Sequence, residues 1–277
     1  MAQNFHLPPV GFGPGSQPDD GEGLEWLPLP SGMRTYDMHL PEVGNVASLA
    51  PALAMLAEIA AACDRVAQGA APVSFDLSAL DAANRALMAE TLGQGEVSLR
   101  ARGVPAVAVQ ESVFAGVWVL KAEGIDRVEV APVPQLALTR AFHAQRPAIG
   151  ALAPRAPGVV NAPALLAELM DKSLSWRGPG DLHVVNLTLI PHTEEDLLWL
   201  DQALGEGSVT ILSRGYGNCR ITATAQDRLW RVQFFNSMDV LILDTFEVTA
   251  MPEVVLAAPE DLADSAGRIR EVLGAIR

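Results

Sequence analysis

The chain has 277 residues, of which 33 are acidic and 19 are lysine or arginine, and its net charge is −14. A chain of this length forms roughly two domains and buries about three quarters of its unfolded surface, so neither a disulfide nor a metal is needed to stabilise it. The negative charge repels nucleic acid and favours basic partners, so we expect no binding to nucleic acid.

Residues 1–40 are rich in glycine and proline and show no helical or strand periodicity before about Leu24. This composition predicts a mobile tail that leads into the segment LEWLPLPSGMRTYDMHLPE. Within it, Arg34 and Tyr36 fit a recognition arm and an ordered docking strand equally well. The first residues have no basic region followed by an apolar one, so no export signal is predicted.

An internal duplication organises the rest of the chain. The segment LGQGEVSLRARG, which ends at Gly103, recurs as LGEGSVTILSRG, which ends at Gly215, with six of twelve positions identical. The same offset pairs Trp118 with Trp230, after which the second copy is six residues longer. We therefore expect a first repeat over 41–142, a linker rich in proline and alanine over 143–162, and a second repeat over 163–277.

In the first repeat, apolar residues at helical spacing from Leu53 to Val66 predict a helix with Cys63 as a small core residue on its buried face. A strand at 73–77, a helix at 79–92 and alternating β-rich segments up to about 130 follow. The apolar stretch 46–63 is interrupted by Pro51 and Glu58. It is therefore not expected to insert into a membrane.

The second repeat shows the same order of elements. We predict a helix at 163–174, a strand at 183–189 and a helix at 193–204, in which Thr193 and the acids after it form a cap rather than a catalytic pair of carboxylates. Strands at 208–213, 218–224, 229–236 and 240–247 form a meander, and a helix that starts at Pro259 ends the chain. This order predicts an α+β fold, with two similar lobes packed about a pseudo-twofold axis.

The two copies differ most after their shared motif. Arg214-Gly215 is followed by Tyr216-Gly217-Asn218-Cys219, whereas the first copy continues with Val104-Pro105-Ala106-Val107. Glycine and asparagine at these positions favour a tight hairpin turn, and that alone could explain them. The functional interpretation is that the turn displays Arg214, Tyr216 and Cys219 together, near Asn236 and Ser237 of the neighbouring hairpin. Such a cluster suits recognition of a peptide backbone and carboxylate better than hydrolysis.

No catalytic constellation is found in the sequence. Cys219 would need an adjacent base to act as a nucleophile, and His183 and His192 stand in no recognisable spacing to it. The chain has no phosphate-binding loop, dinucleotide fingerprint, HExxH or GxSxG motif. Neither cysteine falls in a metal-binding spacing, so we expect no metal and no cofactor, and a reducing cytoplasm is the natural location.

Several strings of the second repeat resemble the HupH/HyaF/HoxQ family of hydrogenase expression proteins, which assist the maturation of nickel-iron hydrogenases. They include VVNLTLIPHTEEDLLWLD, SRGYGNCRI, VQFFNS and LILDTFEV, and LPSGMRTYDMHLPE upstream is also similar. The resemblance covers about 24–40 and nearly all of the second repeat. It implies a cytoplasmic accessory protein that is not an enzyme and that acts on the precursor of the hydrogenase small subunit.

That subunit receives iron-sulfur clusters and carries a twin-arginine export signal, so a chaperone that holds the precursor could delay its export. Other hydrogenase maturation proteins are possible further partners. The partner-binding residues predicted from the turn and the resemblance are Arg214, Tyr216, Gly217, Asn218, Cys219, Asn236, Ser237, Arg34 and Tyr36. Two alternatives stay open: a thiol-dependent redox or cluster-delivery factor that uses Cys219, and an adaptor that joins other maturation factors.

Overall fold

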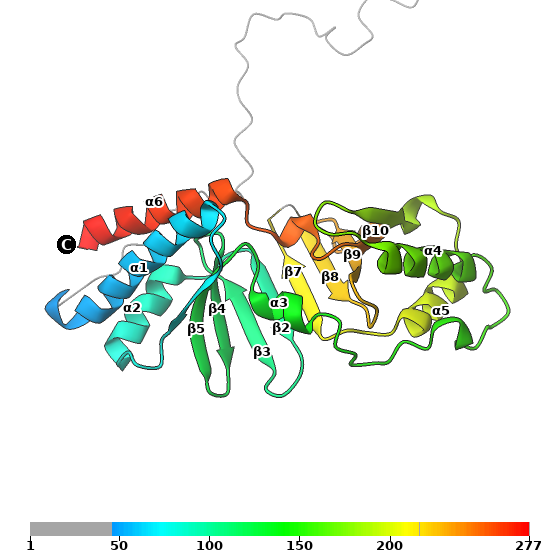
Figure 1. The fold of residues 1–277 in the computed structure, drawn as a ribbon, viewed down its shortest axis with the longest axis horizontal. Coiled ribbons are helices and arrows are strands. Elements are labelled where there is room, and N and C mark those ends of the chain that lie inside the picture. Colours follow the sequence, from blue (N-terminus) through cyan, green and yellow to red (C-terminus); the bar gives the residue numbers. More distant parts are fainter. Residues whose placement is uncertain (1–45, 216, 277) are drawn as a thin grey trace, which may run out of the picture. The chain divides into compact units, whose positions relative to one another are not determined.

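The described residues of this computed structural model, 46–215 and 217–276, form an α+β fold around a ten-stranded antiparallel sheet (Figure 1). The strand order is β1-β5-β4-β3-β2-β7-β8-β9-β10-β6. The strands are β1 (Val73–Asp76), β2 (Val97–Ala101), β3 (Val107–Glu111), β4 (Val117–Ala122), β5 (Ile125–Val130), β6 (His183–Asn186), β7 (Val209–Ser213), β8 (Asn218–Ala223), β9 (Leu229–Phe235) and β10 (Leu241–Val248). The predicted tail, Arg34, Tyr36 and Tyr216 lie outside the described residues.

Five helices occur close to where the sequence pattern predicts them, whereas the short helix at Gln135–Arg140 was not predicted. The helices are α1 (Ala50–Ala67), α2 (Ala82–Leu92), α3 (Gln135–Arg140), α4 (Ala162–Ser175), α5 (Glu194–Leu204) and α6 (Pro259–Ile276), with short 3-10 turns η1 (Val46–Leu49), η2 (Gly150–Leu152), η3 (Leu187–Leu189) and η4 (Glu253–Val255). The prediction of a strand over 183–189 is wrong at its end, because β6 ends at Asn186. The Asn186 side chain accepts a hydrogen bond from the Thr188 N–H, which turns the backbone out of the ladder into η3.

The two repeats meet at the centre of the sheet, where β2 pairs with β7. Leu99 lies opposite Ile211, and Val97 lies opposite Ser213. The offset that relates Gly103 to Gly215 also relates Leu99 to Ile211, so Leu99 is paired with its own equivalent and a local twofold axis passes between them. The predicted α+β fold and duplication are confirmed. The repeats are joined edge to edge in one sheet, a connection that the sequence pattern did not predict.

Equivalent positions in the two repeats make equivalent contacts. Trp118 and Trp230 are fully buried. Their indole N–H groups donate to the carbonyls of Ala131 at 2.9 Å and Thr249 at 3.2 Å. The length difference falls at the last hairpin, as predicted: β4 and β5 are joined by residues 123–124, whereas β9 and β10 are joined by 236–240.

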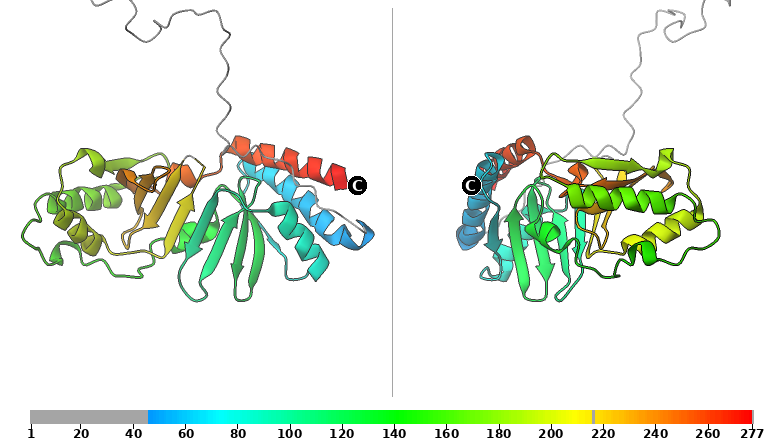
Figure 2. Two further views of the ribbon diagram at one scale, coloured as in Figure 1. Left: turned by 180° about the vertical axis from the view of Figure 1, so that it is seen from behind. Right: turned by 45° about the vertical axis from the view of Figure 1, so that its right-hand side comes forward.

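The core of repeat 1 is completed by the last helix of the chain. Leu262, Ala266, Ile269 and Leu273 of α6 are buried in one apolar cluster with α1, α2 and the β4–β5 end of the sheet. Figure 2 shows α6, in red, alongside α1, in blue, in both views. Within the described residues, α1 is long and apolar enough to cross a membrane by length and composition alone. Its residues Leu56 and Ile59 are fully buried in this cluster.

Described elements cover the middle of the sheet on one face only. Trp118, Trp230 and the inward-facing residues of β2, β3, β7 and β8 pack with α3 and η4. On the other face, Arg100, Ala108, Leu212 and Arg220 are exposed. The helices α1, α2 and α6 pack over one end of the sheet and α4 and α5 over the other.

The start of α5 is capped as predicted from its acidic first turn. Thr193 Oγ1 accepts from the Asp196 N–H at 3.0 Å, and the Asp196 carboxylate accepts from the Thr193 N–H at 3.2 Å. Asp196 Oδ1 also accepts from the N–H groups of Val160, Asn161 and Ala162, at 2.8, 3.0 and 2.9 Å, and so holds the start of α4. Burial alone would raise the pKa of Asp196, but these backbone donors outweigh it and hold the pKa below its usual range.

Candidate partner-binding site

Two turns of repeat 2 lie side by side at one end of the sheet. Asn218, the first residue of β8, pairs with Phe235, the last residue of β9. The Asn218 side chain donates to Asp239 Oδ1 at 3.1 Å, which joins the β7–β8 turn to the β9–β10 turn. We call this surface the repeat-2 tip. It comprises Arg214, Gly217, Asn218, Asn236, Ser237, Met238, Asp239 and Val240.

The conformation of the tip follows from its residue types. Gly217 has φ +99°, a left-handed conformation that glycine adopts without strain. Asn236 Oδ1 accepts from the N–H groups of Met238 and Val240, at 2.9 and 3.0 Å, and so closes the β9–β10 turn on itself. The amide oxygen of Asn236 is therefore occupied within the turn, whereas the exposed side chains of Arg214 and Ser237 face solvent.

One strand edge beside the tip carries no partner strand within the described residues. β6 pairs with β10 only from Thr245 to Val248, and the Asp244 N–H donates to Thr188 Oγ1 at 2.9 Å. Residues 241–243 at the start of β10, which we call the free edge, lie beyond this pairing. A bulge at Ile242 interrupts the register with β9 here. Bulges often re-aim side chains beside functional sites.

The free edge and the adjoining turn are unusually apolar for an exposed segment. The exposed fractions are 80% for Met238, 54% for Val240, 44% for Leu241 and 55% for Ile242. These residues belong to the longer hairpin of repeat 2, which has no counterpart in the two-residue turn of repeat 1. A run of exposed apolar side chains along a strand edge that has no partner is typical of a surface that binds another chain by strand addition.

The sequence contained a signal for this edge that its interpretation missed. Repeat 2 is six residues longer than repeat 1 near its last hairpin, as predicted, and the apolar residues 240–243 (VLIL) follow the turn directly. Asn186 lies opposite Thr245 in an antiparallel register, so a strand running to 189 would have paired with residues 242–244 and covered part of this segment. Because β6 ends at Asn186, residues 241–243 have no partner strand on this side among the described residues.

The described histidines of repeat 2 do not pair with Cys219. His183 Nε2 lies 2.8 Å from Glu168 Oε1, and His192 Nδ1 lies 2.8 Å from the Ile190 carbonyl, so both imidazoles have partners other than Cys219. No group of three histidine, cysteine, aspartate or glutamate side chains within 46–215 and 217–276 is placed to hold a metal ion.

Comparison with known proteins places the chain in a family. The family described as HupH hydrogenase expression protein, C-terminal conserved region, matches residues 49–146 and 159–276. The chain is 65% identical to hydrogenase expression/formation protein HupH of Rhodobacter capsulatus over 277 residues, which is 100% of each chain. It is 45% identical to hydrogenase expression/formation protein HoxQ of Cupriavidus necator over 98% of this chain and 97% of the relative. The chain belongs to the HupH family of hydrogenase expression proteins.

The resemblance predicted from SRGYGNCRI and the neighbouring strings is thus confirmed. The two segments that match the HupH family fall on the two structural repeats. A solved structure of the hydrogenase expression protein HupH from Thiobacillus denitrificans is 28% identical, with a TM-score of 0.38, over 42% of this chain and 95% of the solved one.

In this HupH-family chain, the prediction that the turn displays the Cys219 side chain is wrong. Cys219 is only 3% exposed and packs in the central core with Ile211 and Trp230. It lies on the inward face of β8 because successive side chains of a strand alternate between the two faces, and Asn218 and Arg220 face outward. Burial, and next the Glu247 carboxylate, raise the pKa of the Cys219 thiol to about 12. The thiol is therefore protonated at neutral pH and is not displayed by the turn.

Replacing this cysteine should affect stability and leave binding intact. We expect Cys219→Ser to lower the free energy of unfolding by about 1–3 kcal/mol, because a hydroxyl is placed in an apolar core, and to leave capture of the partner within about twofold of wild type. Urea unfolding and partner pull-down on the same preparation measure both quantities. The Cys219→Ser protein could also stay folded and capture the partner but fail to support hydrogenase maturation in the cell. That result would favour the thiol-dependent alternative.

Proposed function

We propose that the protein is a cytoplasmic accessory chaperone of nickel-iron hydrogenase maturation, and not an enzyme. It binds the small-subunit precursor before cluster insertion and twin-arginine export. Its membership of a family of hydrogenase expression proteins supports the maturation role. The choice of the small subunit and its export signal as the target follows from the sequence resemblance described above.

The free edge is the observation that carries this proposal. It offers unpaired backbone groups and apolar side chains next to the repeat-2 tip, an arrangement that suits a partner segment in extended conformation. The net charge of −14 attracts a basic signal peptide at long range. Arg214 and Asn218, both exposed at the tip, are placed to bind backbone carbonyls or a carboxylate of the same segment.

Co-purification with the small subunit tests the proposal directly. The full chain is used to capture the precursor and, in parallel, a version of the subunit that lacks its signal peptide. Capture of the precursor alone supports recognition of the signal peptide, and capture of both versions moves the contact to the body of the subunit. Capture of neither version contradicts the chaperone proposal.

Variants of the tip locate the contact. Arg214→Ala and Tyr216→Ala are expected to weaken capture of the precursor if the proposed residues contribute, and equal capture by folded variants would place the site elsewhere. The thiol-dependent alternative has less support, because Cys219 is buried and its pKa is raised to about 12.

A further inference from the structure

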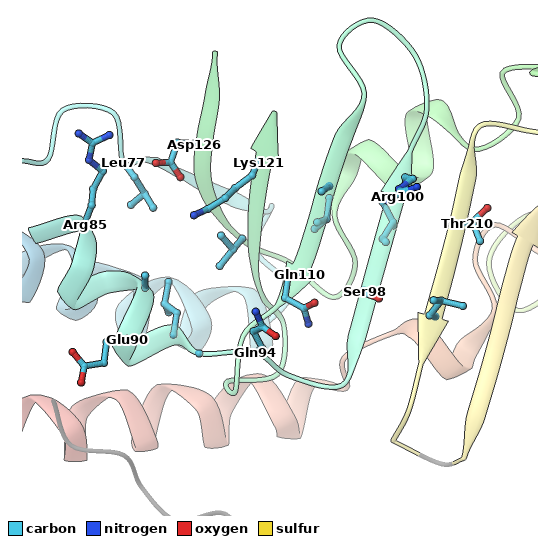
Figure 3. Close-up of a pocket in the computed structure, with 18 of the residues that line it drawn as sticks. Leu77, Arg85, Glu90, Gln94, Ser98, Arg100, Gln110, Lys121, Asp126 and Thr210 are labelled. Carbon is cyan, nitrogen blue, oxygen red and sulfur yellow. The ribbon is translucent and has the colours of Figure 1, made fainter. Parts of the chain in front are cut away.

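A groove in repeat 1 lies on the uncovered face of the sheet, away from the proposed contact at the free edge. It has a volume of about 950 Å³ and runs between α2 and the strands β4, β3, β2 and β7. Figure 3 shows Arg85 of α2, Lys121 of β4 and Arg100 of β2 around it. Apolar side chains also line the groove, among them Leu77, Leu92, Val119 and Leu212.

The charge of the groove is opposite to that of the chain. Its lining includes four cations, Arg85, Arg100, Arg102 and Lys121, and two acids, Glu90 and Asp126, although the whole chain carries −14. Arg102 is held by an ion pair with Glu206. Arg85, Arg100 and Lys121 are exposed and make no ion pair within the described residues, so their charges are available to a ligand.

The strands that form the groove floor are paired with neighbouring strands on both sides. β2 pairs with β3 and β7, β3 also pairs with β4, and β4 also pairs with β5. A peptide bound on this floor therefore finds no strand edge and must satisfy its own backbone hydrogen bonds. A helix does so, and its side chains alone then make the contact. The cations come from three different elements around a floor that is apolar at Val119 and Leu212, with Gln110 and Ser98 between them. Cations spread over this area suit a helix better than one small anion.

From this combination of charge, apolar side chains in the lining and paired strands, we propose that the groove binds an amphipathic helix of a partner protein. The apolar face of the helix packs on Val119 and Leu212, and acidic side chains along its flanks meet Arg85, Arg100 and Lys121. This second docking surface does not depend on the proposed function. It gives the protein separate sites for a helical segment and, at the free edge, for an extended one.

Binding of a designed peptide to the full chain tests the proposal. The probe is a fluorescent peptide of about 18 residues, long enough for five helical turns, with leucines at i, i+3, i+4 and i+7 and glutamates on the remaining face. The double variant Arg100→Glu, Lys121→Gln is expected to weaken its binding about tenfold or more, and added salt should weaken binding to wild type more than to the variant.

A control variant with the same change in charge separates the groove from the net charge. Arg127→Glu with Lys172→Gln alters an exposed residue on the opposite sheet face and one on α4, and should bind the probe as wild type does. Arg127 lies on that face because its strand partner, Leu120, is buried in the central core. Equal loss of binding in both double variants overturns the proposal.

Two altered probes test the chemistry of the ligand. A version with a central proline, which breaks the helix, and a version with lysine in place of glutamate should both bind at least about tenfold more weakly. Equal binding of either one overturns the proposal. The proposal is also wrong if inorganic phosphate, and not the peptide, binds in a way that depends on Arg100. It is wrong as well if sedimentation shows that the protein is a dimer and that only the Arg100→Glu, Lys121→Gln variant dissociates.

Discussion

Ile242→Lys is expected to weaken capture of the small-subunit precursor by about tenfold or more. A lysine on a strand edge opposes strand addition, because an arriving strand must bury or displace the charge, and natural sheets protect their edges in this way. A tenfold loss corresponds to about 1.4 kcal/mol, which is within the range expected for removing one apolar contact and adding one unfavourable charge. Titration of labelled precursor against the purified chain measures the change.

The matched control is Leu174→Lys. Leu174 lies near the end of α4 and is 83% exposed, against 55% for Ile242, so both substitutions add a lysine at an exposed apolar position. Both should change the free energy of unfolding by no more than about 0.5 kcal/mol. If the two variants capture the precursor equally well, strand addition at the free edge is wrong, whatever the partner proves to be.

Asp196→Ala is expected to cause the largest loss of stability of the substitutions considered, roughly 3–5 kcal/mol. Its fully buried carboxylate accepts hydrogen bonds from four backbone N–H groups, those of Val160, Asn161, Ala162 and Thr193. Alanine leaves these donors without an acceptor at the starts of two helices, and hydrogen bonds to a charged group contribute more than neutral ones. Urea unfolding at pH 7 measures the difference.

The equivalent position of repeat 1 supplies the control. The repeat offset relates Asp196 to Asn84, which accepts from one helix-start N–H, that of Ala52 at 2.9 Å. Because this side chain is neutral and serves fewer donors, Asn84→Ala should cost about 1–2 kcal/mol, less than Asp196→Ala. An equal cost at the two positions would contradict the role assigned to the charge.

The pH dependence of Asp196→Ala has a definite sign. The pKa of Asp196 is below its usual range in the folded protein, so its contribution to stability is present above the ordinary pKa of about 3.9 and is lost as the pH falls through the lower folded value. The difference in unfolding free energy between wild type and Asp196→Ala should therefore be full at neutral pH and shrink in acid. A difference that stays constant down to the acid transition would exclude the carboxylate as its source.

Local pattern was enough to predict most elements of this fold. The apolar spacing of α1 and α6, the Thr193 cap and the β7–β10 meander depend on neighbouring residues, and the structure has them within a few positions. Contacts between segments that are far apart in the sequence could not be predicted from local pattern. The pairing of Leu99 with Ile211 joins strands from different repeats, and α6 packs on α1 across most of the chain.

The candidate site was predictable only in part. The adjacency of the two turns followed from the meander, and the Asn218–Asp239 contact bears it out. The inward orientation of Cys219 depends on the register of β8, and one residue of register decides which face a strand side chain occupies. The free edge was missed because it arises where another strand stops. The sequence of β10 cannot show by itself where β6 ends.

The packing of α6 on α1 also fixes the order in which the chain can fold as it is made. The helix α1 of repeat 1 leaves the ribosome before any strand of repeat 2, yet Leu262, Ile269 and Leu273 of the same core are synthesised only after β10. Until they arrive, the apolar face of α1 has no helix to cover it, and exposed apolar surface of this kind invites association with other chains. The core of repeat 1 can therefore be completed only after all the strands of repeat 2 have been translated.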